Sequence, residues 1–476
     1  MTFAELKTLL FARSNFGMKL GLERMHEACA LLGDPQRSAP VLHVAGTNGK
    51  GSTCAFTEAS LRAAGLRTGM YTSPHLNHFC ERIRIDGEPI GEERACELLE
   101  EIHAQVPWAL ADPGLTFFEI VTLMGFLAFR DVEVMVVEVG LGGRLDATNV
   151  VEPLACAVAT LGLEHTQYLG ATLGEIAAEK AGIFKSGAPA VSAGQPLPAA
   201  QVLQRRAAEL GISLWRPGRD YRFESRDVRP FCYQGPRWAV RAGDLALQGH
   251  HQRTNAALAC ALLEAAAQAG LRVEPHHAEA GLRTARWPAR LERFGNVLVD
   301  GAHNPPAVNA LVRALPALVT GKIHLVFGAL QDKDAAAMLR ELLPLCASMH
   351  FCAPDSPRAL RPEVLAAFCL DAVNPAGQVR ATPVNPGGDV QPDAVNPAGG
   401  VRAFPVNPDG EVRALAVEAG GEVRAFTYQT AAEALAAARL AAGQGTVLCC
   451  GSLYLAAELR ALLLGEPRTS MPSERL

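Results

Sequence analysis

At 476 residues the chain is longer than a single hydrophobic core usually serves, so two domains are expected. Hydrophobic residues form 49% of the chain and charged residues 20%, which excludes a disordered protein, and a net charge of −5 disfavours nucleic acid and anionic membranes as partners. No apolar run approaches the roughly 18 residues of a membrane span, the start lacks the pattern of a secretory leader, and the cysteines include no Cys-x-x-Cys pair. We therefore expect a cytoplasmic protein.

The first part of the chain alternates short apolar runs with segments of helical length. Strands are predicted at residues 41–45, 132–139, 154–161 and 188–192, with helices at 54–64, 118–129 and 174–183. Such alternation is typical of a parallel sheet covered by helices. A second series predicts strands at 297–300, 324–328 and 446–450, and helices at 306–319, 335–343, 431–442 and 454–463. The junction is expected at the Trp-Pro-Ala-Arg segment 287–290, where proline interrupts a helix.

One segment, residues 373–422, fits neither series. Val-Asn-Pro recurs at positions 373, 384, 395 and 406, each 11 residues on, and a degenerate copy begins at Val417. Asn-Pro followed by Gly supplies turn chemistry, and the valines could form very short strands. Five such copies could stack into a solenoid, but the low apolar content favours a mobile insertion that carries no function.

A phosphate-binding loop is indicated by His-Val-Ala-Gly-Thr-Asn-Gly-Lys-Gly-Ser-Thr, residues 43–53, which runs from a strand through a glycine turn into a helix. Glycines let backbone N–H groups face phosphate oxygens, and the helix N-terminus adds its dipole. Lys50 supplies a point charge, and either Ser52 or Thr53 supplies a hydroxyl for phosphate or Mg²⁺. The pattern departs from G-x-x-x-x-G-K-[ST], because Val44 stands at the first glycine position and Gly51 follows the lysine. ATP-binding residues are predicted at Thr47, Asn48, Gly49, Lys50, Gly51, Ser52 and Thr53.

The predicted fold is therefore α/β, with a P-loop parallel-sheet ATPase domain over residues 1–288 followed by a smaller Rossmann-like α/β domain over 289–476. A second glycine run, residues 140–145, also follows a predicted strand. It does not match the dinucleotide fingerprint G-x-G-x-x-G, because position 145 is leucine. The polar Asp-Ala-Thr-Asn at 146–149 comes next instead of an apolar helix, which argues against an NAD-dependent oxidoreductase.

Two strings of residues carry a resemblance to a known family. They are the phosphate loop Ala-Gly-Thr-Asn-Gly-Lys-Gly-Ser-Thr at 45–53 and Glu-Val-Gly-Leu-Gly-Gly-Arg-Leu-Asp-Ala-Thr-Asn at 138–149. Both resemble the Mur-type ATP-dependent amide ligases, and most closely their folate branch, the folylpolyglutamate synthases and dihydrofolate synthases. The likeness extends over nearly the whole chain outside 373–422. It implies that Asp146, Ala147 and Thr148 help to line the pterin side of a substrate pocket.

The resemblance also implies a metal site that is assembled from separate segments. Ser73, Glu138 and His165 would be the Mg²⁺ ligands. Magnesium favours oxygen, so the hydroxyl, the carboxylate and the nucleotide phosphates suit it, whereas a histidine is less usual. Lys180 matches a lysine that is carbamylated in the family, and capture of CO₂ requires a neutral amine whose pKa burial has depressed. Glu164 precedes His165 where the family has aspartate, a change that preserves the charge.

Substrate and nucleotide contacts are implied by resemblance at further positions. An aromatic in the Thr-x-Phe-Glu motif could stack on a planar heterocycle or form helix core, and Arg82 would assist the acid substrate. The substrate-side residues are Leu20, Gly21, Leu22, Arg82, Thr116, Phe117, Phe118 and Glu119. On the nucleotide side stand Asn255, Arg290 and Asp300, with His303 facing the reacting centre and Ser452 holding the incoming amino acid. Ala289 replaces the family's glycine before Arg290, which would matter if that glycine needed a positive φ.

The function implied by this resemblance is ATP-dependent addition of L-glutamate to dihydropteroate and to tetrahydrofolates through an acyl phosphate, with Lys50, Lys180 and His303 as catalytic residues. ATP and Mg²⁺ are the expected cofactors, a monovalent cation is a further candidate, and we expect a monomer. The alternatives are a monofunctional folylpolyglutamate synthase and, from another class, a nucleotide-binding switch without ligase activity. A cell-wall Mur ligase is disfavoured, because the phosphate loop already begins at residue 46 and leaves no room for a UDP-binding domain.

Overall fold

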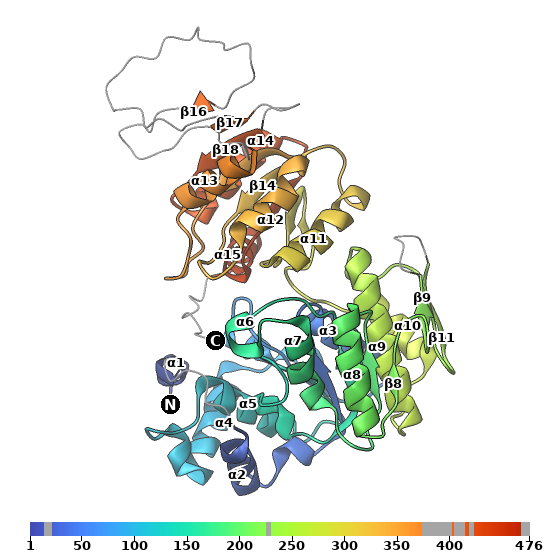
Figure 1. Ribbon diagram of the computed structural model, residues 1–476. Coiled ribbons are helices and arrows are strands. Elements are labelled where there is room, and N and C mark those ends of the chain that lie inside the picture. Colours follow the sequence, from blue (N-terminus) through green and yellow to red (C-terminus); the bar gives the residue numbers. More distant parts are fainter. Residues whose placement is uncertain (14–20, 225–229, 374–401, 404–414, 418–422, 468–476) are drawn as a thin grey trace. The chain divides into compact units, whose positions relative to one another are not determined.

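The fold is taken from a computed structural model of the chain, drawn in Figure 1. The structure describes residues 1–13, 21–224, 230–373, 402–403, 415–417 and 423–467. These residues form two compact units, which divide between Trp287 and Pro288. Most of the repeat segment 373–422, and with it the choice between a mobile insertion and a solenoid, lies outside the described residues.

The first unit is built on an eight-stranded sheet in the order β4-β3-β2-β5-β1-β6-β7-β8. Its strands β2, β5, β1, β6, β7 and β8 are parallel, and β3 and β4 add an antiparallel edge. The strand bounds are β1 Val41–Ala45, β2 Thr68–Tyr71, β3 Ile83–Ile85, β4 Glu88–Pro89, β5 Val134–Glu138, β6 Pro153–Val158, β7 Ala190–Ser192 and β8 Leu214–Trp215. A separate antiparallel sheet joins β9 Arg222–Phe223, β10 Phe231–Gln234 and β11 Ala239–Ala242.

Helices cover both faces of the large sheet, because every residue of β1 is buried and successive side chains face opposite sides. Leu42 and Val44 pack with α3, α9 and α10, whereas Val41 packs with α1, α2, α4 and α5, and Ala45 with α7 and α8. The helix bounds are α1 Phe3–Ala12, α2 Glu23–Leu31, α3 Lys50–Ala63, α4 Glu92–Gln105, α5 Phe117–Ala128, α6 Thr166–Leu169, α7 Leu173–Lys180, α8 Leu197–Glu209, α9 His250–Gln268 and α10 Pro275–Thr284.

The second unit has its own sheet, in the order β12-β13-β19-β14-β15-β18-β17-β16. Strands β13, β19, β14, β15 and β18 are parallel, while β12, β17 and β16 are antiparallel additions. The strands are β12 Glu292–Phe294, β13 Val297–Val299, β14 Ile323–Phe327, β15 Cys346–Phe351, β16 Arg402–Ala403, β17 Leu415–Val417, β18 Val423–Thr427 and β19 Val447–Cys450. The helices are α11 Pro305–Ala314, α12 Ala335–Leu342, α13 Pro362–Val373, α14 Ala431–Ala442 and α15 Leu453–Leu464.

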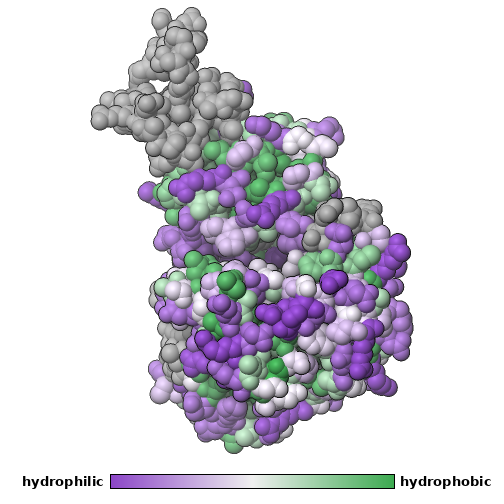
Figure 2. Space-filling model, turned by 45° about the vertical axis from the view of Figure 1, so that its right-hand side comes forward, coloured by the Kyte–Doolittle hydropathy of each residue, from purple (hydrophilic) through white to green (hydrophobic). Residues whose placement is uncertain are grey.

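The predicted α/β class and the parallel sheets are confirmed, with differences in detail. The helix expected at 54–64 begins one turn earlier, at Lys50, and the one expected at 306–319 ends at Ala314 because a 3₁₀ turn with proline follows. Among the described helices, none is long and apolar enough to cross a membrane. Figure 2 shows hydrophilic and apolar residues mixed over the described part of the face in view.

Close packing of α10 on α3 generates a first prediction. A Cβ on Gly281 would lie 2.3 Å from the backbone nitrogen of Ser60, so the Gly281→Ala methyl would push the helices apart. We expect a loss of about 1–3 kcal/mol in the free energy of unfolding, measured by urea denaturation. Gly174→Ala in α7 is the matched control, since its nearest neighbours would be 3.8 Å away, and it should be neutral or stabilising. Equal stability of the two variants would contradict this packing.

Candidate active site

The phosphate loop joins β1 to α3, and hydrogen bonds tie its first half to the segment after β6. The N–H groups of Thr47 and Asn48 both donate to the carbonyl of Thr160, at 3.0 and 3.1 Å. The Thr47 hydroxyl also pairs with the backbone of Gly162 at 3.2 Å. Thr47 and Asn48 therefore anchor the loop with these groups, and the N–H groups that remain to face a phosphate come from the start of α3.

The start of α3 decides which hydroxyl is available to a ligand. Gly49 is the N-cap and takes a left-handed φ of 90°, which suits a residue without a side chain. Thr53 donates its hydroxyl to the Gly49 carbonyl at 2.8 Å. The Ser52 hydroxyl is buried and has no hydrogen-bond partner among the described residues. A buried hydroxyl without a hydrogen-bond partner costs free energy of folding. Ser52 is therefore the hydroxyl to which a phosphate or metal would supply the missing partner.

Two side chains rest on the glycines of the loop. A Cβ on Gly49 would lie 2.3 Å from the amide oxygen of Asn255, and one on Gly51 would lie 2.7 Å from the indole ring of Trp287. Asn255 is itself held by a hydrogen bond to Gln252 at 2.9 Å. The departure from the usual Lys-Ser/Thr spacing thus has a steric cause, because the indole occupies the space that a side chain at position 51 would need.

Charged groups gather beside the loop. Glu138 ends β5 and is 4% exposed, and its carboxylate lies 3.9 Å from the Lys50 ammonium. Lys180, the last residue of α7, is also buried and donates to the Gly46 carbonyl at 2.9 Å. Burial, followed by repulsion from Lys50, lowers the pKa of Lys180 to about 7. The depressed pKa that amine chemistry at Lys180 requires is therefore present.

The other two expected metal ligands, Ser73 and His165, lie in loops whose backbone conformation is fixed or unusual. The loop after Ser73 is fixed by Glu81, whose carboxylate accepts the N–H groups of Leu76, Asn77 and His78 at 2.7–3.0 Å. His165 sits at the start of α6 with a left-handed φ of 50°, which is uncommon for a residue other than glycine. No group of three His, Cys, Asp or Glu side chains suited to a metal is found in the described part of the chain. An ion held by Glu138 would thus draw further ligands from nucleotide and water oxygens, as Mg²⁺ does.

The polar string after β5 folds into a buried network. Asp146 accepts hydrogen bonds from the Leu141 N–H at 2.8 Å and from the N–H and hydroxyl of Thr148 at 3.0 and 2.5 Å. His43 on β1 contacts the same hydroxyl through Nε2 at 2.9 Å, and burial lowers the pKa of His43 to about 3, so this imidazole is neutral. Burial also raises the pKa of Asp146. Ala147 and Thr148 are buried with it.

The Thr-x-x-Glu segment at the start of α5 is a helix cap. Thr116 and Glu119 form a capping box, and Glu119 pairs with Arg24 of α2 at 3.0 Å. Phe117 is buried among core side chains, 5.4 Å from the ring of Phe11, which favours the core interpretation for this residue. Phe118 is only partly buried and is the aromatic available for stacking.

The remaining residues predicted to contact the substrate are Arg82 and residues 20–22. Arg82 is fully buried, donates to His75 Nδ1 at 2.8 Å and lies over the Phe117 ring at 5.2 Å. It therefore supports these two side chains from within the core. Gly21 has a positive φ of 124° and Leu22 precedes α2, whereas Leu20 lies outside the described residues.

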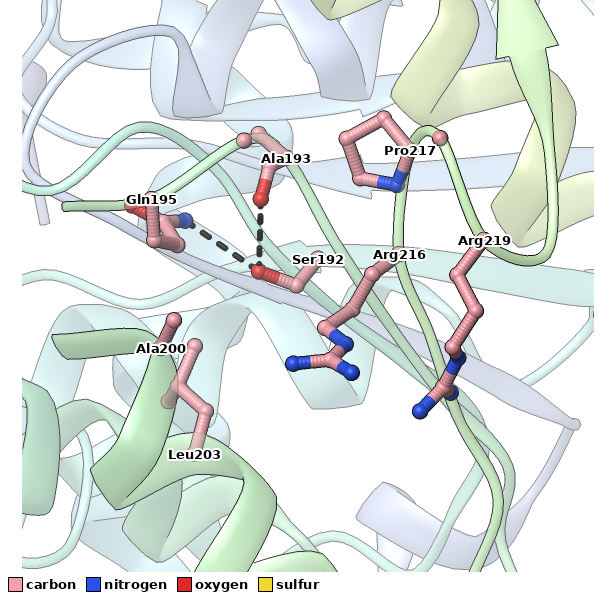
Figure 3. Close-up of a pocket in the computed structure, with 10 residues that line it drawn as sticks. Ser192, Ala193, Gln195, Ala200, Leu203, Arg216, Pro217 and Arg219 are labelled. Carbon is pink, nitrogen blue, oxygen red and sulfur yellow. Dashed lines mark hydrogen bonds between the residues drawn. The ribbon is translucent and has the colours of Figure 1, made fainter. Parts of the chain in front are cut away.

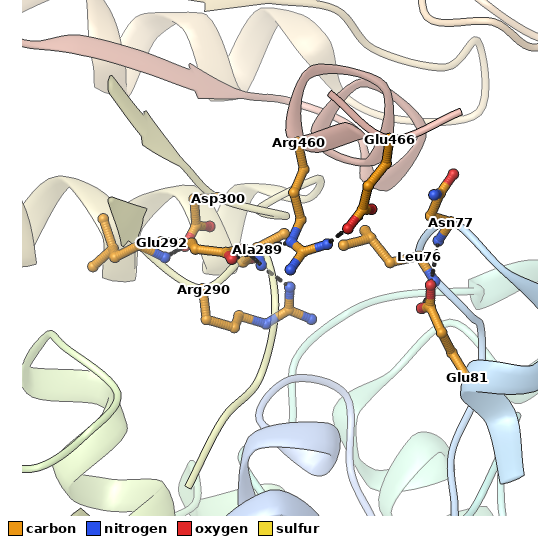
Figure 4. A network of polar contacts seen from close by, with 10 residues as sticks. Leu76, Asn77, Glu81, Ala289, Arg290, Glu292, Asp300, Arg460 and Glu466 are labelled. Carbon is orange, nitrogen blue, oxygen red and sulfur yellow. Dashed lines mark hydrogen bonds and ion pairs between the residues drawn. The ribbon is translucent and has the colours of Figure 1, made fainter. Parts of the chain in front are cut away.

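In the second unit, the residue before Arg290 adopts the conformation of a glycine. Ala289 has a φ of 53°, so the positive φ considered from the sequence is required here and alanine adopts it. Its carbonyl accepts from the Arg290 guanidinium and from the Gly301 N–H, both at 2.8 Å. Its N–H donates to Glu292, which Arg460 of α15 pairs with at 2.8 Å, as Figure 4 shows.

The other expected residues of this unit fix loops and helix ends. Asp300 is buried and accepts the N–H groups of Leu291 and Ala302 at 2.9 and 2.8 Å, and burial raises its pKa. His303 Nδ1 contacts the Gly301 carbonyl at 2.8 Å, which places the ring proton on Nδ1. Ser452 is buried and caps α15 by accepting the Tyr454 N–H at 3.1 Å.

Several supporting residues were not singled out by the sequence analysis. Glu81 closes a capping box with His78, which the usual Ser/Thr-x-x-Glu/Gln pattern does not indicate. Trp287 and Glu292 act through contacts with residues far away in the sequence, which no local pattern reveals.

Comparison with known proteins decides the family. Residues 289–382 match the Mur ligase, glutamate ligase domain. A dihydrofolate synthase/folylpolyglutamate synthase of Bacillus subtilis is 35% identical over 382 residues, which cover 75% of this chain and 86% of that protein. This chain belongs to the folylpolyglutamate synthase/dihydrofolate synthase family. The resemblance read from the phosphate loop and the Asp-Ala-Thr string is confirmed.

Further relatives agree with this assignment. A probable bifunctional folylpolyglutamate synthase/dihydropteroate synthase of Halobacterium salinarum is 39% identical over 395 residues, although the chain spans only 47% of that longer protein. The solved structure of E. coli FolC in complex with DHPP and ADP has a TM-score of 0.79 and 29% identity, with 98% of each chain covered. A bifunctional member of the family from Yersinia pestis, complexed with AMPPNP and Mn ion, has a TM-score of 0.78 and 30% identity over 98% of each chain. The protein is thus an ATP-dependent ligase of the folylpolyglutamate synthase/dihydrofolate synthase family.

The contact between Gly51 and Trp287 gives a test of the loop. Gly51→Ser would recreate the usual Lys-Ser pair but drive its Cβ into the indole, so we expect a loss of about 1–3 kcal/mol in unfolding free energy and weaker ADP binding. Tryptophan fluorescence and calorimetry measure both effects. Gly91→Ser is the control, because its added Cβ would have no atom within 4 Å among the described residues other than its chain neighbours. Unchanged ADP affinity and fluorescence in Gly51→Ser would refute the steric explanation.

Proposed function

We propose that this chain joins L-glutamate to dihydropteroate and to tetrahydrofolates, as a bifunctional dihydrofolate synthase and folylpolyglutamate synthase. The observation that carries the proposal is the phosphate loop, with its orphaned Ser52 hydroxyl, lying beside Lys50, Glu138 and Lys180. The names of the relatives support the folate substrates. A monofunctional folylpolyglutamate synthase is the alternative.

The chemistry follows from the poor leaving ability of a carboxylate oxygen. The acid attacks the γ-phosphorus of ATP, ADP leaves, and the acyl phosphate that forms is attacked by the glutamate amine to give the amide and phosphate. Lys50 and Arg290 would stabilise charge on the transferring phosphoryl group, and the helix N-terminus of α3 would orient the nucleotide. His303 would hold a proton near the reacting centre through Nε2, because its Nδ1 is committed to Gly301.

The donor set suits a magnesium ion, which would neutralise phosphate charge when it is bound. Ser73, Glu138 and His165 would hold it, and the Ser52 hydroxyl is placed to bind phosphate or metal. A monovalent cation is a further proposed ligand.

We also propose a cytoplasmic monomer. All twelve cysteines are free thiols, which suits a reducing compartment.

A labelled-glutamate assay tests the proposed activity. Purified protein, ATP, Mg²⁺ and labelled glutamate should give a labelled pterin amide with dihydropteroate and, separately, with tetrahydrofolate. Lys50→Ala should lower turnover by about 10² or more, since it removes charge stabilisation from the phosphoryl group. Lys322→Ala, an exposed residue of the second unit, is the control. Product with tetrahydrofolate alone would select the monofunctional alternative, and ADP binding without product from either acid would support the nucleotide-binding switch.

Carbamylation of Lys180 is proposed as well, and its pH dependence can be measured. A neutral amine adds CO₂ and releases a proton, so the carbamate should increase as pH rises through the pKa of about 7. Protein equilibrated with ¹³C-bicarbonate should show a carbamate carbonyl signal in NMR that grows between pH 6 and 8. The signal should vanish in Lys180→Gln and persist in Lys185→Gln. A wild-type spectrum identical to that of Lys180→Gln would rule the modification out.

A further inference from the structure

The segment after β6, residues 159–162, lies between the phosphate loop and a side chain that has no role in the site described so far. On one side, Thr160 and Gly162 bond to Thr47 and Asn48. On the other side, the Gln195 side-chain amide bonds to the two residues that alternate with them, Ala159 and Leu161. Its Nε2 donates to the Ala159 carbonyl at 2.9 Å, and its Oε1 accepts the Leu161 N–H at 3.0 Å.

This pairing continues the sheet beyond its last strand residue. Strand β7 pairs with β6 as far as Ser192, which lies opposite Val158. After this pair, the segment that follows β7 turns away from segment 159–162. Its backbone therefore no longer supplies partners for the Ala159 carbonyl and the Leu161 N–H. The Gln195 amide offers one donor and one acceptor in the place of a backbone unit, so it satisfies both groups.

Gln195 is itself held in place. Its Nε2 also contacts the Ser192 hydroxyl at 3.2 Å, and that hydroxyl donates to the Ala193 carbonyl at 2.9 Å, as Figure 3 shows. Tyr221 donates to the Ser192 carbonyl at 2.8 Å from a buried position. The other side of Gln195 and Ser192 borders a pocket of about 290 Å³.

We infer that Gln195 is a positioning residue for nucleotide binding, acting through segment 159–162 on the phosphate loop. The inference rests on the proposed role of that loop. Loss of the amide would leave the Ala159 carbonyl and the Leu161 N–H without partners, and segment 159–162 would shift or fray. The Thr160 carbonyl would then no longer hold Thr47 and Asn48 at one fixed place, and segment 159–162 leads directly to Glu164 and His165.

The test uses Gln195→Met, which keeps the side-chain length and removes both polar groups. ADP affinity of the full-length protein is measured by calorimetry with Mg²⁺ present, and KM values are measured for ATP and for glutamate. We expect ADP affinity to fall about tenfold, and the KM for ATP to rise by a similar factor, because two backbone hydrogen bonds that shape the site are lost. The KM for glutamate should change less than about twofold, since the hydrogen-bond partners of Gln195 among the described residues all belong to the first unit.

Controls separate positioning from general destabilisation. Gln204→Met, on the neighbouring helix α8, should leave ADP affinity unchanged, and Ser192→Ala should weaken it less than Gln195→Met does, because it loosens only the support of the amide. Thermal unfolding followed by circular dichroism reports whether each variant is folded. A folded Gln195→Met protein that binds ADP like the wild type would overturn the inference, even if its melting temperature falls.

Lys50→Ala distinguishes this inference from the proposal beneath it. If Lys50→Ala loses ADP binding while Gln195→Met keeps it, segment 159–162 holds the loop without Gln195 and only the inference fails. If Lys50→Ala also binds ADP normally, the loop is not the nucleotide site and the proposed function fails with it.

Discussion

One carbonyl oxygen, that of Thr160, fixes the position of the phosphate loop. It accepts hydrogen bonds from the N–H groups of both Thr47 and Asn48, so these two donors in the first half of the phosphate loop are already paired within the protein. The second half of the loop leads into the start of α3. The loop is in this respect an extension of β1 that pairs with an extension of β6. The site therefore inherits its rigidity from the centre of the parallel sheet, where β1 lies between β5 and β6.

Close contacts rather than a motif explain the composition of the loop. Asn255 and Trp287 rest on Gly49 and Gly51, and both come from segments more than two hundred residues further along the chain. A glycine-rich loop is flexible by itself, and the entropy of ordering it is large. Side chains that cover its glycines restrict that freedom before the nucleotide arrives, which lowers the cost of binding.

Sequence patterns predicted the elements in which apolar residues recur with a clear period. They missed elements in which nearly complete burial removes that period. The strand at 41–45 and the helix at 431–442 have the predicted bounds. Helix α9, His250–Gln268, was not predicted, because nearly all of its residues after the first turn are buried and no polar face marks the helical repeat. The small sheet β9–β11 was missed as well, since its strands are only two to four residues long.

Within the site, the sequence identified residue types but not their conformations. The loop, Glu138 and Lys180 come together as the motifs imply, since strand ends of a parallel sheet share one edge. The positive φ of His165 has no sequence signal, because the residue is not glycine, whereas the positive φ of Ala289 was indicated only by the resemblance to a family that has glycine there. Phe117 and Phe118 are chemically equal in the sequence, and only the helix direction decides that Phe117 enters the core while Phe118 stays partly exposed.

The charges beside the loop show why the ligand completes this site. Glu138 and Lys180 are buried and Lys50 is partly buried, and an unpaired buried charge costs several kcal/mol as an order of magnitude. Lys50 and Glu138 are 3.9 Å apart, which offsets part of that cost, and Lys180 lowers its own cost by giving up its proton near pH 7. A triphosphate would add negative charge beside Lys50 and would offer acceptor oxygens to the Ser52 hydroxyl, which has no partner among the described residues. Phosphate oxygens would give these buried polar groups partners, and that would add to the affinity for the nucleotide.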